Sequence, residues 1–243
     1  MLALPRVMDL LPTMPDRLTE IARRFSDGSN PATRLAAGAL YELYERYVGH
    51  LADQPVTLLE LGVHSGESLK TFATYFAKGK IVGIDATDRS VDYSAFPSIA
   101  FRVCDQRNGP QLAAICAELA PDGLDIIIDD ASHVGTWSLL SYQALFDHLR
   151  PGGYYVVEDW GTGYWDDWPD GSHFQQFTPD ATFGKLGKRI PSHDFGMVGF
   201  VKYLVDEVAG GRIRPTSKAP RSRPDRMQEM HVHKEMVVLR KAS

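Results

Sequence analysis

Acidic residues follow each of five short apolar runs in this 243-residue sequence, and their type and spacing could support chemistry. If each run is a strand of one parallel sheet, the carboxyl ends lie along the edge where open α/β proteins bind ligands. Carboxylates crowded at one edge repel one another, so the pattern favours hydroxyl-bearing ligands, a cationic ligand or a metal ion there. In chain order the acidic residues are Glu60, Asp85, Asp105, the pair Asp129 and Asp130, and the pair Glu158 and Asp159.

A metal site is predicted from Asp130 and the pair Glu158 and Asp159. The strands that precede them would lie about 5–10 Å apart in the sheet, and oxygen-only ligation favours Mg²⁺ or Ca²⁺ over zinc. His133 follows Asp130 by three residues, and histidine is the usual general base. We therefore expect His133 to act beside the metal as a base or a substrate contact. The alternative is a helix-capping or core histidine.

A glycine-bearing turn after the first apolar run predicts a nucleotide-type cofactor site. Between Val56 and Asp85 an apolar run is followed by a turn with Gly62 and Gly66, a helical segment, and a second apolar run that ends at Asp85. Glycines let the backbone approach a ligand, and an acid about 20 residues on binds ribose hydroxyls. The glycine spacing differs from the dinucleotide fingerprint, so the prediction depends on Asp85 as well.

Apolar runs and helical patterns alternate along the chain, which predicts a parallel sheet covered on both faces. Two closing strands, 227–233 and 235–239, are almost contiguous and predict an antiparallel hairpin or one bulged pair, unlike the all-parallel sheet of dehydrogenases. The other predicted strands are 56–61, 80–84, 99–104, 124–129 and 153–157. The predicted helices are 15–25, 30–51, 67–77, 111–119, 137–149 and 193–209.

Length and composition predict one domain with a full core and an N-terminal helical extension. We expect the extension over residues 1–52 and a cofactor-binding domain over 53–243, with an insertion at about 160–192. The net charge of -5 argues against a nucleic-acid partner. The first residues hold no apolar stretch of signal-peptide or membrane length, and the two cysteines show no metal or redox spacing. A cytoplasmic setting without a membrane partner is expected.

Several segments together carry a resemblance to a known family: LLELGVHSGESL, IVGID, VCDQRN, LDIIIDDASH and GGYYVVEDW. The specific part is the pair IDDxSH and VxED at a matching separation. From about Ser26 to Lys241 the chain resembles class I S-adenosylmethionine-dependent methyltransferases. Within them it is most similar to metal-assisted natural-product O-methyltransferases, namely the mycinamicin and macrocin sugar methyltransferases and the cephalosporin hydroxylase group. Catechol-type methyltransferases resemble it more distantly.

The resemblance implies a Rossmann-like fold, a mostly parallel seven-stranded sheet ending in an antiparallel hairpin, with N-terminal helices. It implies Mg²⁺-assisted methyl transfer from S-adenosylmethionine to a hydroxyl of a small natural product such as a sugar. By the same resemblance Glu60, Gly62, Ser65 and Gly66 would hold the amino-acid end of the cofactor, Asp85 its ribose, and Asp105 and Gln106 the adenine side, with Asp129 also on the cofactor side. The metal ligands would be Asp130, Glu158 and Asp159, and the base His133.

The segment from Trp160 to Trp168 contains three of the four tryptophans of the chain, beside several glycines. We interpret it as a substrate wall or lid that stacks on a sugar or aromatic ring, with Trp160, Tyr164 and Trp165 as contacts. The alternative is a loop anchored to the sheet edge by ordinary apolar packing.

Three tyrosines of the second predicted helix, Tyr41, Tyr44 and Tyr47, are interpreted as core or oligomer contacts rather than substrate contacts. Homo-oligomers are common in the family that the chain resembles, so we expect one here. Three alternative functions stay open at this point: a catechol or phenol O-methyltransferase, a nicotinamide-dependent oxidoreductase, and a non-catalytic module that keeps only the cofactor pocket.

Overall fold

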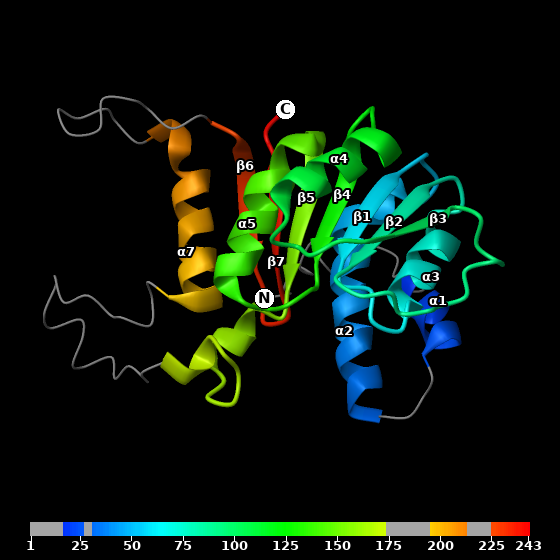
Figure 1. Ribbon diagram of the computed structural model, residues 1–243, viewed down its shortest axis with the longest axis horizontal. Coiled ribbons are helices and arrows are strands. Elements are labelled where there is room, and N and C mark those ends of the chain that lie inside the picture. Colours follow the sequence, from blue (N-terminus) through cyan, green and yellow to red (C-terminus); the bar gives the residue numbers. More distant parts are fainter. Residues whose placement is uncertain (1–16, 27–30, 174–194, 213–224) are drawn as a thin grey trace, which may run out of the picture.

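The computed structural model describes residues 17–26, 31–173, 195–212 and 225–243, and the strands in this part of the chain follow the predicted apolar runs (Figure 1). The strands are β1 (Thr57–Leu61), β2 (Lys80–Asp85), β3 (Ile99–Val103), β4 (Leu124–Asp129), β5 (Leu149–Glu158), β6 (Met227–Val232) and β7 (Met236–Lys241). The α-helices are α1 (Arg17–Phe25), α2 (Pro31–Val48), α3 (Glu67–Tyr75), α4 (Gly109–Leu119), α5 (Gly135–Leu145) and α7 (Gly196–Val208). The short 3₁₀ helices are η2 (Gly49–Leu51), η3 (Phe146–His148), η4 (Trp160–Tyr164), η5 (Gly171–His173) and η7 (Gly210–Arg212).

The seven strands form one sheet in the order β3-β2-β1-β4-β5-β7-β6. Strands β1 to β5 are parallel, and β7 pairs antiparallel with both β5 and β6. This is the mostly parallel sheet with a closing antiparallel hairpin that the sequence predicts, so the predicted fold class is confirmed. The chain order reverses beside β1, because β2 and β3 extend to one side of it and β4 to the other.

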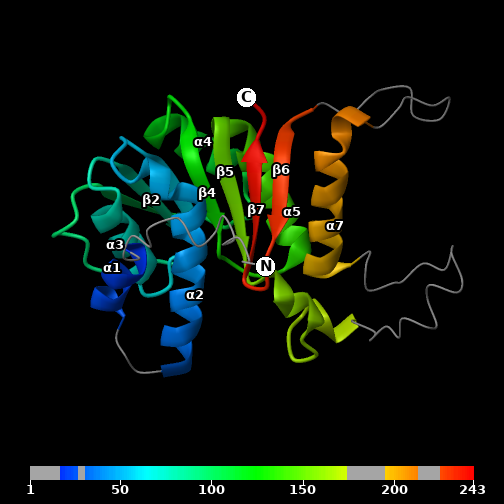
Figure 2. The ribbon, with the colours of Figure 1, turned by 180° about the vertical axis from the view of Figure 1, so that it is seen from behind.

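Helices cover the sheet on both faces, as Figures 1 and 2 show from opposite sides. Helices α4, α5 and α7 pack on one face around Tyr142, Tyr155 and Phe200. Helices α1, α2 and α3 pack on the other face around Tyr44 and Phe72. The central strand β4 is buried from both sides, which explains why its middle residues, Ile126 to Ile128, are all apolar rather than alternating. The predicted domain boundary between residues 52 and 53 stays a prediction.

The boundary predicted between the helix at 137–149 and the strand at 153–157 is wrong. Helix α5 ends at Leu145, the 3₁₀ helix η3 follows, and β5 begins at Leu149. The register of β4 and β5 shifts between Leu124 and Ile126, and Gly152 has a φ of 76°. Strand β5 therefore runs through an irregularity at a proline–glycine segment, where local sequence composition predicts a turn.

The predicted insertion at 160–192 is described up to residue 173, where it forms η4 and η5. Its remaining residues, and residues 213–224 of the basic loop between α7 and β6, lie outside the described residues. In the part of the chain that the structure describes, no helix combines the length and apolar character needed to cross a membrane.

Candidate active site

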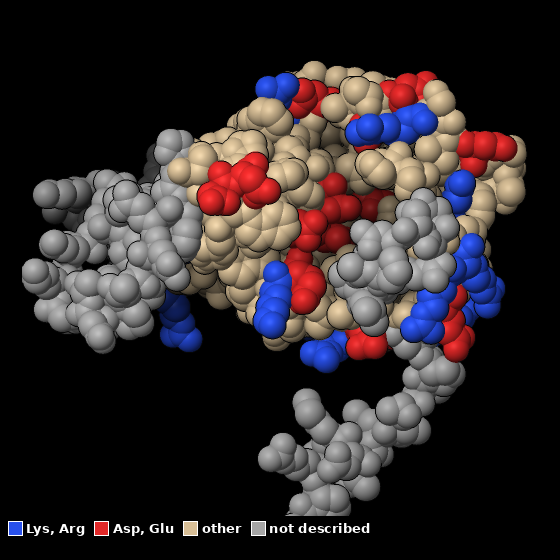
Figure 3. Space-filling view, turned by 90° about the horizontal axis from the view of Figure 1, so that it is seen from below, with Lys and Arg blue, Asp and Glu red and all other residues tan. Residues whose placement is uncertain are grey.

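The carboxyl ends of the parallel strands meet at one edge of the sheet, which faces the viewer in Figure 3. At this edge Leu61 of β1 pairs with Ile84 of β2 on one side and with Asp129 of β4 on the other. Asp129 in turn pairs with Val157 of β5. The acidic residues that end these strands or follow them are thereby brought together, and Figure 3 shows Asp and Glu side chains gathered in a central hollow.

A cleft of about 260 Å³ lies at the ends of β1 to β4. Its lining includes Ala131 and Ser132 of the loop after β4, together with Trp137 of α5. Four of the predicted cofactor residues also line it: Gly62, Asp85, Asp105 and Gln106. The other four, Glu60, Ser65, Gly66 and Asp129, are not part of the lining. The cleft therefore corresponds to the predicted ribose and adenine side of the cofactor site.

Gly62 is where the turn after β1 touches the loop after β4. Its φ is 87°, and a Cβ at this position would lie 2.0 Å from the backbone oxygen of Asp130. Only glycine permits this approach, since both the conformation and the contact exclude a side chain. Two further residues of the same turn have positive φ values: His64 with 45° and Gly66, which precedes α3, with 76°. Ser65 between them is exposed. The close approach places the predicted cofactor turn directly against the predicted metal loop.

Asp85 is a buried carboxylate with several donors. Its Oδ2 accepts hydrogen bonds from the backbone N–H groups of Val63 at 3.1 Å and His64 at 3.3 Å. Its Oδ1 accepts one from the backbone of Thr87 at 3.0 Å and lies 3.1 Å from Nε of Arg89. Burial alone would raise the pKa of Asp85, but these hydrogen bonds lower it below its usual value. Asp85 is thus ionised at neutral pH, as an acceptor of hydrogen bonds from ligand hydroxyl groups must be.

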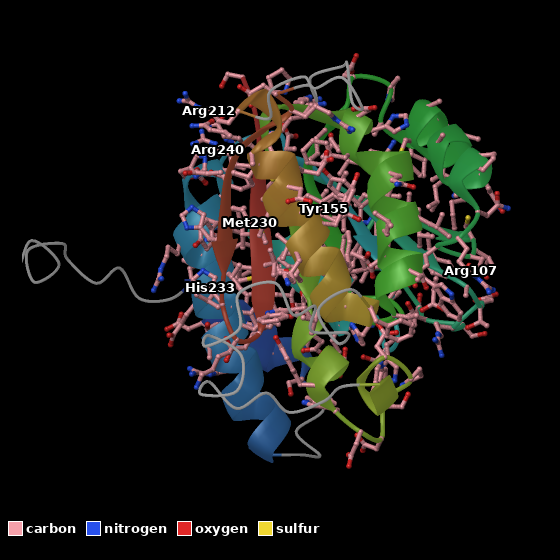
Figure 4. All side chains as sticks on the ribbon, turned by 90° about the vertical axis from the view of Figure 1, so that its left-hand side faces the viewer. Arg107, Tyr155, Arg212, Met230, His233 and Arg240 are labelled. Carbon is pink, nitrogen blue, oxygen red and sulfur yellow. The ribbon has the colours of Figure 1, made fainter. Side chains whose placement is uncertain are left out.

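Asp105 and Arg107 form a bidentate pair beside the cleft, with Nη2 to Oδ2 at 2.5 Å and Nε to Oδ1 at 2.9 Å. The hydrogen bonds from Arg107 lower the pKa of Asp105 to about 2. The guanidinium also lies 4.3 Å from the ring centre of Trp137, and Figure 4 shows Arg107 on the side of the molecule away from the β6–β7 hairpin. Gln106 accepts a hydrogen bond from the backbone of Ser132 at 3.1 Å, which ties the end of β3 to the loop after β4.

Glu60 and Asp129 are buried behind the cleft lining. Asp129 accepts hydrogen bonds from Ser141 at 3.0 Å and from Gln106 at 3.4 Å, and Glu60 accepts one from Ser68 at 3.0 Å. Burial raises the pKa of both carboxyl groups, that of Glu60 to about 8. Their predicted contact with a cofactor stays a prediction, as it does for Ser65 and Gly66.

Asp130, His133 and Asp159 converge at the ends of β4 and β5. Each offers a ligand atom that lies within 4.8 Å of the other two. The Nε2 atom of His133 lies 3.8 Å from Oδ1 of Asp130 and 3.8 Å from Oδ2 of Asp159. His133 and Asp159 both have positive φ values, 52° and 49°, and such conformations are costly for these residue types and cluster at functional sites.

Glu158 takes a different position from its neighbour Asp159. Its side chain is buried and its Oε1 accepts a hydrogen bond from the hydroxyl of Tyr44 at 2.5 Å. Burial raises the pKa of Glu158 to about 7, against the effect of the Tyr44 hydrogen bond and with a contribution from the charge of Asp159. The predicted role of Glu158 as a third carboxylate ligand stays a prediction.

The metal side of the site gathers four carboxyl groups, namely Asp130, Glu158 and Asp159 with Glu60 beside them. Burial, and then the charges of Glu158, Glu60 and Asp159, raise the pKa of Asp130 well above its usual value. Within the described ranges no Lys or Arg forms an ion pair with any of these four carboxylates. Two convergent carboxylates beside two further buried ones form a donor set that fits a divalent cation such as Mg²⁺.

The segment after β5 fixes the backbone of the loop that carries His133. The carbonyl oxygen of His133 accepts hydrogen bonds from Nε1 of Trp168 at 3.1 Å and from Oγ1 of Thr162 at 3.3 Å. Asp170 accepts a hydrogen bond from the backbone N–H of Gly135, the first residue of α5, at 2.6 Å. The sequence placed Thr162 and Trp168 within the tryptophan-rich segment, whereas no local pattern singles out Asp170.

The three predicted substrate contacts differ in exposure. Trp160 packs against the core and donates a hydrogen bond from Nε1 to the carbonyl oxygen of His233 at 2.7 Å. Tyr164 is 40% exposed and Trp165 is 53% exposed. The segment is thus anchored at Trp160, as the alternative interpretation expects, and also presents accessible aromatic rings. A substrate role for Trp160, Tyr164 and Trp165 stays a prediction.

Comparison with known proteins gives relatives of one kind, although no protein-family model matches the chain. The chain is 30% identical over 206 residues to 8-demethyl-8-alpha-L-rhamnosyl tetracenomycin-C 2'-O-methyltransferase of Streptomyces olivaceus, covering 82% of this chain and 49% of that protein. It is 31% identical over 206 residues to demethylmacrocin O-methyltransferase of Streptomyces fradiae, covering 82% and 47%. The chain therefore spans about half the length of the curated relatives that it matches.

Among solved structures, the chain is similar to the MycE methyltransferase from the mycinamycin biosynthetic pathway in complex with Mg and SAH. The TM-score is 0.72 at 26% identity, covering 93% of this chain and 53% of that one. A second crystal structure of MycE, with Mg, SAH and mycinamycin VI, gives a TM-score of 0.68 at 26% identity, covering 95% and 55%. The resemblance predicted from the sequence is confirmed by both kinds of comparison.

Proposed function

We propose that this chain, which shares the fold of class I S-adenosylmethionine-dependent methyltransferases, catalyses Mg²⁺-assisted methylation of a hydroxyl on a small natural product, in particular on a sugar. The observation that carries this proposal is the convergence of Asp130, His133 and Asp159 next to the cleft at the ends of β1 to β4. The cluster and the cleft are adjacent, because Ala131 and Ser132 line the cleft and lie between Asp130 and His133 in the sequence. A methyl acceptor bound at this edge would therefore lie next to the base, His133, and next to the cofactor.

The cleft supports S-adenosylmethionine as the cofactor. When bound, it would supply an electrophilic methyl group on a positively charged sulfur. Asp85 would accept hydrogen bonds from the ribose hydroxyls, and Asp105 and Gln106 would border the adenine. Gly62 leaves room for the backbone to approach the ligand, since no side chain fits there. The acidic edge also suits a cationic cofactor.

Asp130 and Asp159, with Glu158 beside them, would hold Mg²⁺. When bound, the ion would act as a Lewis acid that lowers the pKa of a nearby acceptor hydroxyl. The two carboxylates come from different strands, so the position of the site depends on the pairing of β4 with β5. Vicinal hydroxyls of a sugar are acceptors of the kind that such a site orients.

His133 would remove the proton of the acceptor hydroxyl at Nε2, the atom that faces both carboxylates. General base catalysis contributes typically about 10²–10⁴-fold to the rate. The hydrogen bonds from Trp168 and Thr162 to its carbonyl oxygen hold the loop that carries the imidazole. Fixed placement of acceptor, base and cofactor supplies up to roughly 7–11 kcal/mol of the barrier reduction.

Calorimetric titration with S-adenosylhomocysteine, once with Mg²⁺ and once with EDTA, tests the cofactor class. We expect micromolar binding to the full chain. Absence of binding under both conditions would overturn methyl transfer, and NAD would then be the next ligand tested. The strand order with an antiparallel β7, together with the relatives, already disfavours a nicotinamide-dependent oxidoreductase.

A panel of acceptors tests the substrate class. We expect methyl transfer to glycosides with vicinal hydroxyls, because the relatives include proteins named for methylation of rhamnosyl and olivosyl compounds. Transfer to catechols alone would replace the sugar with a phenol and leave the cofactor and metal assignments in place.

The remaining parts of the proposal concern partners and location. We infer a cytoplasmic homo-oligomer that binds neither nucleic acid nor membranes. The net charge of -5 supports the part of this inference that concerns nucleic acid. Light scattering coupled to gel filtration measures the oligomeric state, and a monomeric mass would exclude the oligomer.

A further inference from the structure

We propose that Tyr44 of α2 is a positioning residue of the metal site and that it acts through Glu158. The inference rests on the proposed function, because it concerns the Mg²⁺ site of that reaction. The two residues are 114 positions apart in the sequence. The sequence predicts only a core or oligomer contact for Tyr44, whereas the structure places its hydroxyl against the acidic cluster.

The contact between Tyr44 and Glu158 is buried and specific. Tyr44 is 1% exposed and Glu158 is 8% exposed. The hydroxyl of Tyr44 donates the hydrogen bond to Oε1 of Glu158. The ring of Tyr44 packs edge-to-face on Phe72, with ring centres 5.3 Å apart. The packing fixes the ring, and the ring fixes the position of the hydroxyl.

A tyrosine hydroxyl is suited to orienting a carboxylate that must also face a cation. It restrains one oxygen of Glu158 and adds no positive charge, whereas a Lys or Arg at this position would compete with the cation for the carboxylate. Glu158 directly precedes Asp159, so a shift of its side chain also affects the end of β5. Groups that orient metal ligands in this way change metal affinity by about 10–100-fold when they are removed.

Tyr47, one helical turn further along α2, provides a matched comparison. Its hydroxyl lies 2.7 Å from Nε2 of His233, which is not one of the acidic residues of the site. Figure 4 shows His233 beside α2, where the β6–β7 hairpin turns. The same substitution at Tyr47 therefore removes a hydroxyl and one hydrogen bond from the same helix without touching Glu158.

The experiment compares Tyr44→Phe with Tyr47→Phe in the full chain. Binding of Mn²⁺, measured by the electron paramagnetic resonance signal of the free ion, reports on the site without turnover. We expect Tyr44→Phe to weaken Mn²⁺ binding by about tenfold or more and to leave the affinity for S-adenosylhomocysteine unchanged. Turnover of this variant should recover at high Mg²⁺ concentration. Tyr47→Phe should bind Mn²⁺ as the wild type does, and equal Mn²⁺ affinity in both variants would overturn the proposal.

A second pair of variants separates an effect through Glu158 from a general loss of packing. In a Glu158→Gln background, adding Tyr44→Phe should change the Mn²⁺ affinity by less than about twofold. A loss as large as in the wild-type background would show that Tyr44 does not act through Glu158. A wild-type chain that binds S-adenosylhomocysteine but not Mn²⁺ would overturn the Mg²⁺ part of the proposed function, and this inference with it.

Discussion

The acidic edge is the row of carboxylates at the carboxyl ends of the strands. Its cofactor side and its metal side differ in whether the carboxylates have arginine partners and in the direction of their pKa shifts. On the cofactor side Asp85 and Asp105 are each paired with an arginine, at 3.1 Å and 2.5 Å. Hydrogen bonds lower the pKa of both, in Asp85 against the opposing effect of burial. On the metal side burial raises the pKa of Asp130 and Glu158, and no arginine or lysine of the described chain pairs with them.

The difference indicates what each side is prepared to bind. A carboxylate that the protein already neutralises can accept hydrogen bonds from a ligand without requiring a new positive charge. Clustered carboxylates that are buried without a positively charged partner are costly to ionise, and a bound cation relieves that cost. We therefore propose that the edge offers one place for neutral hydroxyl groups and another for a cation, although both consist of aspartate and glutamate.

The largest expected effect comes from removing a carboxylate of the metal side. Asp159→Ala, or Asp130→Ala, should abolish Mg²⁺-dependent turnover, because each supplies one of the two convergent carboxylates. The affinity for S-adenosylhomocysteine should stay unchanged, since neither side chain lines the cleft. Calorimetry and a methyl-transfer assay measure the two properties. Wild-type turnover in either variant would remove the metal from the proposed reaction.

Removing the base should have the next largest effect. His133→Ala is expected to lower the turnover number by about 10²–10⁴-fold, while Mn²⁺ binding persists through the two aspartates. If His133 is instead a metal ligand, Mn²⁺ binding falls together with turnover. Steady-state kinetics at saturating Mg²⁺, combined with Mn²⁺ titration, distinguish these outcomes. Normal turnover would assign His133 a purely structural role.

A substitution on the cofactor side should weaken binding of S-adenosylhomocysteine and leave metal binding intact, the reverse of what is expected for Asp159→Ala. Asp85→Asn removes the charge that would accept ribose hydroxyls and is expected to weaken binding of S-adenosylhomocysteine by roughly 10–100-fold, since hydrogen bonds to charged groups contribute about 1.5–3 kcal/mol. Mn²⁺ affinity should stay within about twofold of the wild type. A variant that loses both ligands would show that the two sides are not independent.

The last expected effect is on the pH dependence of stability and leaves the catalysed reaction aside. The pKa of Glu60 is raised from 4.5 to about 8 by burial, so the unfolded chain releases this proton first as the pH rises. The stability that Glu60 contributes is complete below about pH 4.5 and is lost as the pH approaches 8, by up to roughly 1.4 kcal/mol per pH unit. Glu60→Gln should therefore flatten the decline of the unfolding free energy over this window, measured by urea denaturation without ligands.

A control on the cofactor side sharpens the pH experiment. Asp105→Asn should leave the slope between pH 5 and 8 unchanged, because the pKa of Asp105 is about 2 and the group is ionised in both states over that window. Parallel curves for the wild type and Glu60→Gln would contradict the assigned burial effect.

Much of the fold was predictable because buried parallel strands must be continuously apolar and must end in turns. The alternation of apolar runs and helical patterns predicted the order of elements and the closing hairpin. The same logic placed the acidic residues at one edge, because parallel strands share the direction of their carboxyl ends. Asp130 and His133 are three residues apart, so their proximity follows from the local chain, and the structure brings them within 3.8 Å.

The tertiary structure alone decided which contacts complete the site. Glu158 and Asp159 are neighbours in sequence, yet one is buried against Tyr44 and the other is exposed in a left-handed conformation. Likewise the carbonyl of His133 is held by Trp168, 35 residues away. Periodicity and composition report which face of an element is apolar, but they carry no information on which polar group of a distant element meets a given carboxylate. That pairing depends on how helices and loops pack on the finished sheet.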